Sequence, residues 1–186
     1  MKAHDVIVVG AGDVGLGVAF KALSGGLNVA LVDKGHPGGT CVNSGCVPSK
    51  TLIYTADRMI ETRENAKFGI RSGRIDVDFS AVMERTRRVV ARGRNSIKKA
   101  LKGSNNIEFI NKEARFIDEH TLEAGGRKIR GKRIFLATGA RPSVPPIKGL
   151  EKTPFLTNES VLGLASRPDS IILIGGGFIS LEYAHF

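Results

Sequence analysis

Cys41 and Cys46 are the residues whose type and spacing point most directly to chemistry in this 186-residue chain. They are its only cysteines, and in a cytosolic chain, which we expect here, such a close pair is more often catalytic or metal-binding than structural. Two thiols are too few for a zinc site, and the four histidines are scattered without ligand spacing. We therefore expect a redox-active pair and no metal. A plain stabilising disulfide is the alternative, although so short a loop removes little chain entropy.

The residues around the two cysteines predict a helix from Cys41 to about Thr62, interrupted near Pro48. A cysteine at a helix N-terminus has a lowered thiol pKa, which favours thiol–disulfide exchange. Residues five apart do not share one helical face, so a bridge requires a distorted first turn. Gly45 helps to provide that distortion.

Three glycines near the N-terminus form a second motif, Gly10, Gly12 and Gly15. The apolar run 5–9 predicts a buried strand before them, and residues 13–23 predict a helix after them. The glycines permit a tight turn, close approach of a pyrophosphate and close helix–strand packing. A second predicted strand, 28–32, ends at Asp33, which can accept hydrogen bonds from a ribose. This βαβ pattern predicts a dinucleotide site at a helix N-terminus.

The rest of the chain predicts an α/β fold with a parallel sheet, a helix over 80–101 and a small antiparallel β-meander. The meander is expected from short strands at 107–110, 114–117, 121–123 and 128–130, before a returning strand at 133–136. Four prolines mark a connection over 141–154. A strand at 170–174 and a glycine-rich turn at 175–177 then open a helix.

The final strand and helix lack neighbouring strands that would bury them. We therefore expect residues 1–150 to form one nucleotide-binding domain and residues 151–186 to be the connection and truncated start of a second. On this interpretation the chain is a fragment, and residues 171–186 are poorly anchored or pack on another copy.

Composition narrows the possible partners. The net charge is +10, and much of it lies in 85–102 (RTRRVVARGRNSIKKALK). We interpret this stretch as a solvated helix face, since apolar residues recur at helical spacing and no aromatic residue interleaves the basic ones. The apolar runs are too short to cross a membrane, and no signal peptide is recognisable. We expect a cytoplasmic protein with neither a nucleic-acid nor a membrane partner.

The segment 38–50 (GGTCVNSGCVPSK) resembles the active-site signature of the class I pyridine nucleotide–disulfide oxidoreductases. That family includes dihydrolipoamide dehydrogenase, mercuric reductase and glutathione reductase. The segments 10–15, 137–139 and 175–182 (GGGFISLE) agree with it in order. The resemblance implies a Rossmann-like FAD-binding domain, the first βα unit of an NAD(P)-binding domain, and electron transfer between NAD(P)H, FAD and the Cys41–Cys46 disulfide.

The resemblance also implies roles for individual residues. Cys46 would lie nearer the flavin and form the charge-transfer thiolate, and Cys41 would exchange with the substrate. Lys50 would lie by the flavin N5 and, as a buried lysine, pair with Glu182; a solvated lysine and a surface acid are the alternatives. Phe178 would shield the flavin, or act as a plain core aromatic. The remaining implied FAD contacts are Gly10, Gly12, Gly15, Asp33, Lys34, Gly39, Thr40, Gly45, Glu113, Ala114, Ala137, Thr138 and Gly139.

The sequence 48–50 (PSK) resembles the dihydrolipoamide dehydrogenase and mercuric reductase branch, so the expected substrate is a dithiol or disulfide, or a metal ion. The family's His–Glu base and most of its NAD(P) site have no counterpart in this chain. We therefore expect the chain alone to lack the acid–base groups for thiol exchange, and expect a homodimer at full length. A non-catalytic FAD-binding module is the alternative.

Overall fold

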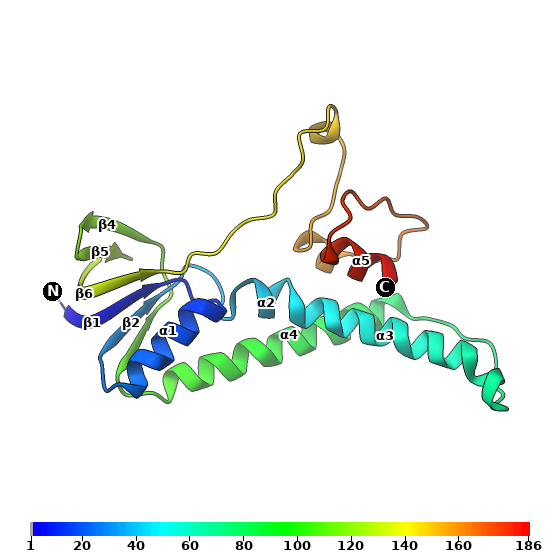
Figure 1. Ribbon diagram of the computed structural model, residues 1–186, viewed down its shortest axis with the longest axis horizontal. Coiled ribbons are helices and arrows are strands. Elements are labelled where there is room, and N and C mark those ends of the chain that lie inside the picture. The colour runs from blue at the N-terminus through cyan, green and yellow to red at the C-terminus, as the bar shows by residue number, and fades with distance from the viewer. Residues whose placement is uncertain (1) are drawn as a thin grey trace. The chain divides into compact units, whose positions relative to one another are not determined.

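The computed structural model describes residues 2–186 (Figure 1). The chain forms two compact units, the first from Met1–Asn43 and Arg92–Arg141, the second from Ser44–Ala91 and Pro142–Phe186. The long helix α4 (Phe79–Lys102) contributes residues to both. These units are interleaved in sequence, and the predicted domain boundary near residue 150 stays a prediction.

The first unit contains a six-stranded mixed sheet in the order β3-β2-β1-β6-β5-β4. The strands β1 (Lys2–Val9), β2 (Val29–Val32), β3 (Ile107–Ile110) and β6 (Arg127–Leu136) run parallel. The strands β4 (Ala114–Asp118) and β5 (Thr121–Ala124) extend the sheet antiparallel from β6. The predicted α/β class, with a parallel sheet and an antiparallel meander, is confirmed.

Continuous apolar runs make the central strands suitable for burial on both faces. All four residues of β2 are buried, and Ile7 and Val8 of β1 have no exposed surface. Helix α1 (Asp13–Ser24) packs on one face through Ala19, beside Val6, Val8 and Leu31. Ile7, Ala30 and Ile129 belong to a second apolar cluster with residues of β5.

The pairing of the strands differs from the expectation in two ways. Strand β3 pairs in parallel with β2 and does not join the meander. The two predicted strands 128–130 and 133–136 are one strand, β6, because Gly131 continues the pairing with β1 opposite His4. A Cβ on Gly131 would lie 2.7 Å from the Ile7 side chain, so a glycine permits the close packing here.

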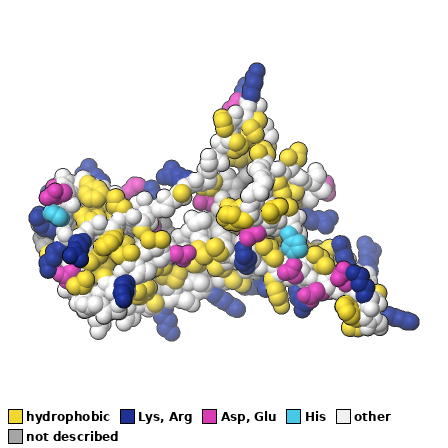
Figure 2. All heavy atoms as spheres, viewed as in Figure 1, with side chains coloured by type: hydrophobic (Ala, Val, Ile, Leu, Met, Phe, Trp, Pro, Cys, Tyr) yellow, Lys and Arg dark blue, Asp and Glu magenta, His cyan; other side chains and the backbone are white. Residues whose placement is uncertain are grey.

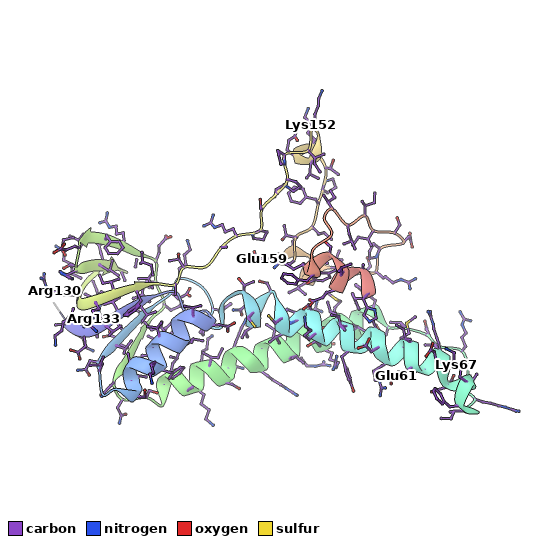
Figure 3. All side chains as sticks on the ribbon, viewed as in Figure 1. Glu61, Lys67, Arg130, Arg133, Lys152 and Glu159 are labelled. Atoms are coloured by element: carbon purple, nitrogen blue, oxygen red, sulfur yellow. The ribbon has the colours of Figure 1, made fainter. Side chains whose placement is uncertain are left out.

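The second unit is built on α3 (Cys46–Glu64), which continues into the 3-10 helix η1 (Asn65–Phe68). The helix predicted from Cys41 is interrupted at Ser44 and Gly45, not at Pro48. Pro48 lies in the first turn of α3, where a helix needs no N–H donor. Glu61 and Lys67, labelled in Figure 3, are exposed on this helical stretch.

The strand predicted at 170–174 is wrong, since residues 171–176 have no regular secondary structure. A strand needs a hydrogen-bonding neighbour, and the side chain of Ile172 is left 90% exposed. The 3-10 helices η2 (Leu150–Lys152) and η3 (Ser160–Gly163) precede it, and α5 (Phe178–His185) follows Gly177 as predicted. The His185 Nε2 lies 2.7 Å from the Asp57 Oδ1, and the rings of Phe186 and Phe79 stack with their centroids 6.3 Å apart. Contacts within the chain therefore hold α5 in place.

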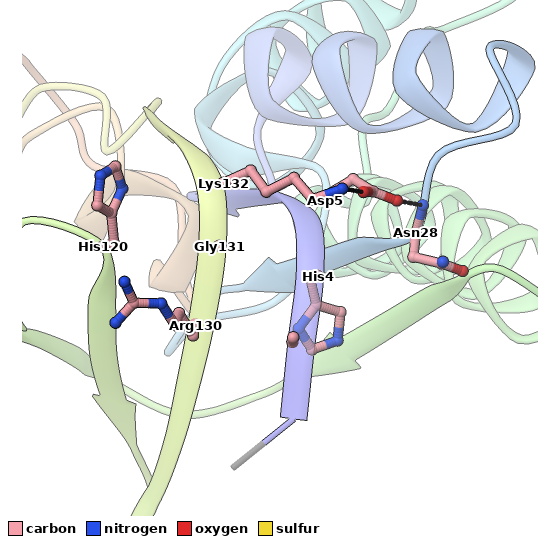
Figure 4. A pocket seen from close by; sticks show the side chains of 8 residues that line it. His4, Asp5, Asn28, His120, Arg130, Gly131 and Lys132 are labelled. Carbon is pink, nitrogen blue, oxygen red and sulfur yellow. Dashed lines mark hydrogen bonds and ion pairs between the residues drawn. The ribbon is translucent and has the colours of Figure 1, made fainter.

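Charged groups organise the amino end of β1, where side chains line a hollow of about 480 Å³ (Figure 4). Lys132 donates to one carboxylate oxygen of Asp5 at 2.7 Å, and the Asn28 backbone N–H donates to the other at 3.0 Å. The hydrogen bond from Lys132 is the main cause of a lowered pKa for Asp5. These contacts fix the strand end opposite to the glycine turn.

Lysine and arginine side chains are spread over the visible face in Figure 2 and do not gather in one patch. Within the 85–102 stretch, Val90 and Leu101 are buried while Arg87, Arg88, Arg92 and Lys99 are exposed. This alternation is the one expected of a solvated helix face. No helix among residues 2–186 is long and apolar enough to span a membrane.

Candidate nucleotide and redox site

The carboxyl ends of the parallel strands hold the glycine motif in a tight turn. The Gly10 N–H donates to the Val32 carbonyl at 2.8 Å, and the Ala137 N–H donates to the Val9 carbonyl at 2.8 Å. Gly10 has φ +109°, which a residue with a side chain rarely adopts. The turn therefore connects β1, β2 and the end of β6, where the segment 137–139 begins.

The three glycines differ in the space that a side chain would find at each of them. A Cβ on Gly15 would overlap the Gly10 carbonyl oxygen, and one on Gly10 would overlap the Ala137 carbonyl oxygen. A Cβ on Gly12 would meet only the Gly39 Cα, at 3.5 Å. Gly10 and Gly15 are thus required by the fold itself, whereas Gly12 leaves its backbone open to a ligand.

Helix α1 begins at this open position, and its first intrahelical bond runs from the Leu16 N–H to the Gly12 carbonyl at 2.8 Å. In residues 2–186, no side chain caps this helix end. The preceding N–H groups of the first turn therefore have no intrahelical acceptor, and they attract anions. Asp13 stands in the same turn and is exposed. The geometry fits a phosphate-bearing ligand.

Asp33 has a structural contact in addition to its predicted role. Its Oδ2 accepts from the Ala11 N–H at 2.6 Å, and its Oδ1 accepts from the Gly35 N–H at 2.7 Å. Each carboxylate oxygen keeps a further lone pair for a ribose hydroxyl. Asp33 therefore ties the glycine turn to the end of β2, which the sequence pattern alone did not reveal.

Asn111 is a residue that sequence reasoning missed. Its side-chain amide donates to the carbonyls of Asp33 and Gly35 at 2.8 and 2.7 Å, and so supports the loop after β2. The available signal was its position immediately after a predicted strand. Lys34 and Glu113 form an exposed ion pair at 2.7 Å, and the hydrogen bond from Lys34 lowers the pKa of Glu113.

The glycine turn directly contacts the start of the cysteine motif. The Gly38 N–H donates to the Ala11 carbonyl at 2.7 Å. Gly39 has φ +54°, and a Cβ on it would lie 2.5 Å from the Gly12 Cα. The helix α2 (Gly39–Asn43), which carries Thr40 and Cys41, thus begins against the glycine turn. Both segments belong to the first unit, which also contains most of the predicted cofactor residues.

Lys50, Glu182, Cys46, Gly45 and Phe178 belong to the second unit. The Lys50 ammonium donates to Glu182 Oε1, and this hydrogen bond is the main cause of a lowered Glu182 pKa. The predicted pairing is confirmed, but the expectation of a buried lysine is wrong, because the Lys50 side chain is 58% exposed. Phe178 is 73% exposed, so within this unit it is not a core aromatic.

The two cysteines lie on the two sides of the break between α2 and α3. Cys41 is half-buried near the end of the first unit, and Cys46 is exposed at the first residue of α3. Gly45 has φ −124° and ψ −114°, which is neither helical nor extended. The predicted backbone distortion at Gly45 is confirmed, and the bridge between the two thiols stays a prediction. Among residues 2–186, no three His, Cys, Asp or Glu side chains gather as metal ligands.

Comparison with known proteins agrees with the family resemblance of the sequence motifs. Residues 4–186 match the model of the family described as pyridine nucleotide-disulphide oxidoreductase. A mercuric reductase of Lysinibacillus sphaericus is 36% identical over 179 residues, which is 96% of this chain and 33% of the relative. A dihydrolipoyl dehydrogenase of Geobacillus stearothermophilus is 34% identical, covering 98% of this chain and 40% of the relative.

A solved structure of the HOCl-induced flavoprotein disulfide reductase RclA from Escherichia coli matches with a TM-score of 0.82. It is 33% identical, and the match covers 97% of this chain and 38% of that one. The chain therefore spans 33–40% of the length of these three proteins. The family name and its flavoprotein members imply FAD and NAD(P)H as cofactors. The chain belongs to the pyridine nucleotide–disulphide oxidoreductase family.

Proposed function

We propose that this chain supplies the FAD-binding site and the redox-active cysteine pair of a disulfide oxidoreductase. The observation that carries the proposal is the contact of Gly38 and Gly39 with the turn formed by Ala11 and Gly12. It joins an anion-binding helix end to the segment that carries Cys41. When bound, FAD would supply a two-electron carrier between NAD(P)H and the cysteines.

The residues of this chain would act in the following way. The uncapped N-terminus of α1 would bind the pyrophosphate, and the carboxylate of Asp33 would accept a ribose hydroxyl. Lys50, oriented by Glu182, would place a positive charge at the isoalloxazine ring. Gly39, Thr40, Gly45, Glu113, Ala114, Ala137, Thr138, Gly139 and Phe178 would complete the contacts.

The cysteine chemistry would proceed by thiol–disulfide exchange. The Cys41 thiolate attacks one sulfur of a substrate disulfide, forming a mixed disulfide and releasing a thiolate that takes up a proton. The Cys46 thiolate then attacks Cys41 Sγ, which forms the internal disulfide and releases the second substrate thiol. Two electrons thereby pass from the cysteine pair to the substrate, and a dithiol substrate drives the same steps in reverse.

We propose dihydrolipoamide, a dithiol, as the substrate, with NAD⁺ as the acceptor of its electrons. The mercuric ion is the second candidate, favoured by the 36% identity to a mercuric reductase. Because most of the NAD(P) site has no counterpart in this chain, the test is a single turnover of the FAD-loaded chain. Reduction of its flavin by dihydrolipoamide would support the first, and reoxidation of the chemically reduced chain by Hg²⁺ would support the second. If the chain bound FAD but exchanged electrons with neither, the non-catalytic module would be the remaining interpretation.

Cys46→Ser tests the roles of the cysteines. Reduction of the FAD-loaded protein should produce a long-wavelength absorbance band in the wild type and none in the variant, with FAD still bound. An unchanged band in Cys46→Ser would show that this thiol does not contact the flavin. A homodimer located in the cytoplasm completes the proposal, and sedimentation of the FAD-loaded protein tests its oligomeric part.

A further inference from the structure

Asn43 lies between the two cysteines, and the cysteine-exchange chemistry proposed above gives it no role. Its side-chain amide donates to the Gly39 carbonyl at 2.8 Å, and also lies 3.3 and 3.4 Å from the carbonyls of His36 and Pro37. A single side-chain amide therefore contacts three backbone carbonyl oxygens in the segment that precedes Cys41.

Arg94 of α4 holds this amide from the other side. Its Nε donates to the Asn43 Oδ1, which fixes the orientation of the amide group and directs its N–H atoms towards the three carbonyls. Arg94 is half-buried, unlike the exposed Arg92 two residues earlier. Arg94 is therefore held by a contact within the protein, whereas the neighbouring basic side chains on the same helix face the solvent.

Apolar packing beside Arg94 supports the same segment. Val42 lies between Gly38 and Gly93, and a Cβ on Gly93 would lie 3.1 Å from Val42 Cγ1. A Cβ on Gly38 would lie 2.7 Å from Val42 Cβ and 3.0 Å from the end of Ile97. The absence of side chains at the two glycines thus lets α2 approach α4 closely enough for Arg94 to reach Asn43.

We infer that Arg94, acting through Asn43, is a positioning residue for the redox pair. It holds residues 36–43 in one conformation and so favours closure of the Cys41–Cys46 disulfide. A chain segment already fixed in the reduced state loses less conformational entropy when the ring closes. The inference rests on the proposed function, because it requires that these cysteines form a disulfide.

The test is the equilibrium of the FAD-free chain with glutathione. Closure transfers two electrons and two protons from the two thiols to glutathione disulfide, giving the internal disulfide and two glutathione thiols. Arg94→Met should lower this equilibrium constant at least tenfold, which corresponds to about 30 mV for a two-electron couple. Asn43→Asp should lower it similarly, since it removes the N–H donors to the three carbonyls.

Two matched variants decide the cause. Arg92→Met removes the same charge from the same helix and should leave the constant within twofold. Arg94→Lys retains a cation and a donor, and should restore it to within threefold of the wild type. Equal losses in Arg92→Met and Arg94→Met would indicate general electrostatics and overturn the inference. So would a wild-type constant in Arg94→Met with an unchanged circular dichroism spectrum.

The same experiment separates this inference from the proposed function. If the wild-type chain formed no Cys41–Cys46 disulfide at any glutathione ratio, the proposed function would fail together with the inference. If it formed the disulfide with a constant that Arg94→Met, Arg94→Lys and Asn43→Asp did not change, only the positioning role would fail.

Discussion

Gly12, Gly15 and Gly17 lie along one short stretch of sequence, yet each should respond differently to a single added methyl group. Gly12 precedes α1 with φ −80°, a conformation open to alanine, and its Cβ would meet one atom at 3.5 Å. Gly15 would place its Cβ onto the Gly10 carbonyl. Gly17 is exposed in the helix, with open space at its Cβ position. Alanine at Gly12 therefore tests the approach of a ligand, alanine at Gly15 tests the packing of the turn, and alanine at Gly17 tests helix propensity.

The magnitudes follow from these environments. Gly15→Ala must displace backbone in a packed turn, and should reduce the free energy of unfolding by about 3 kcal/mol. Gly12→Ala loses a good N-cap residue and should cost about 1 kcal/mol. Gly17→Ala should gain about 0.5–1 kcal/mol, because alanine is the better helix former. The effects on FAD affinity do not follow the effects on stability. Gly12→Ala should weaken FAD binding at least tenfold, or about 1.4 kcal/mol.

Urea unfolding followed by circular dichroism gives the stabilities, and quenching of flavin fluorescence gives the FAD affinities. Gly17→Ala serves as the control and should bind FAD like the wild type. Two results would refute the reasoning. Gly12→Ala that bound FAD within twofold of the wild type would show that no phosphate approaches this backbone. Gly15→Ala with unchanged stability would show that the turn is not tightly packed.

Three further predictions concern charge. Asp13→Asn should strengthen FAD binding about two- to fivefold at low salt, since it removes an anion from the phosphate end of α1, and titrations in 0.5 M salt should show the gain vanish. Glu182→Gln should cost less than about 1 kcal/mol in urea unfolding, because its partner Lys50 is largely exposed; a cost above 2 kcal/mol would contradict this. Burial lowers the pKa of His4 below its ordinary value of 6.5. Below about pH 6.5, His4 therefore binds a proton more readily in the unfolded chain than in the folded chain, and the free energy of unfolding should decrease as the pH falls. His4→Gln should remove that loss, as measured by unfolding between pH 7 and 5, whereas the same change at the more exposed His120 should not.

Strongly patterned segments of the sequence were predictable because local and tertiary preferences agree. The strand predicted at 5–9 is observed at Lys2–Val9, and the helix predicted at 80–101 is observed at Phe79–Lys102. The glycine turn lies between β1 and α1, as predicted. The apolar run 170–174 also carries a strand pattern, but strand formation depends on pairing partners that a local pattern does not encode. Likewise, no local signal distinguishes a meander strand from β3, which pairs with β2 although residues 33–106 separate the two strands in sequence.

The candidate cofactor and redox residues follow largely from motif resemblance, whereas the residues that contact and support their segments do not. Asn43 donates to backbone carbonyls of the segment just before it, and Arg94 donates to the Asn43 side-chain oxygen from a helix far along the chain. Asn111 donates to the backbone carbonyl of the sequence-distant Asp33. Arg94 was grouped with its basic neighbours because charge and spacing are the same for a solvated arginine and a half-buried one. The distinction depends on Gly93 and Val42, whose packing only the folded structure reveals.

Strand β6 also bears on how the molecule folds. It pairs with β1 along Val6–Val9, and Val9 lies opposite Leu136. The chain must therefore close a loop of more than a hundred residues before the centre of the sheet is complete, and contacts of such sequence separation form slowly. The Ala137 N–H that holds the end of β1 becomes available only then. We therefore expect the glycine turn at 10–15, although encoded at the start of the chain, to reach its final form late, so that a ligand that binds it would select molecules whose sheet is already complete.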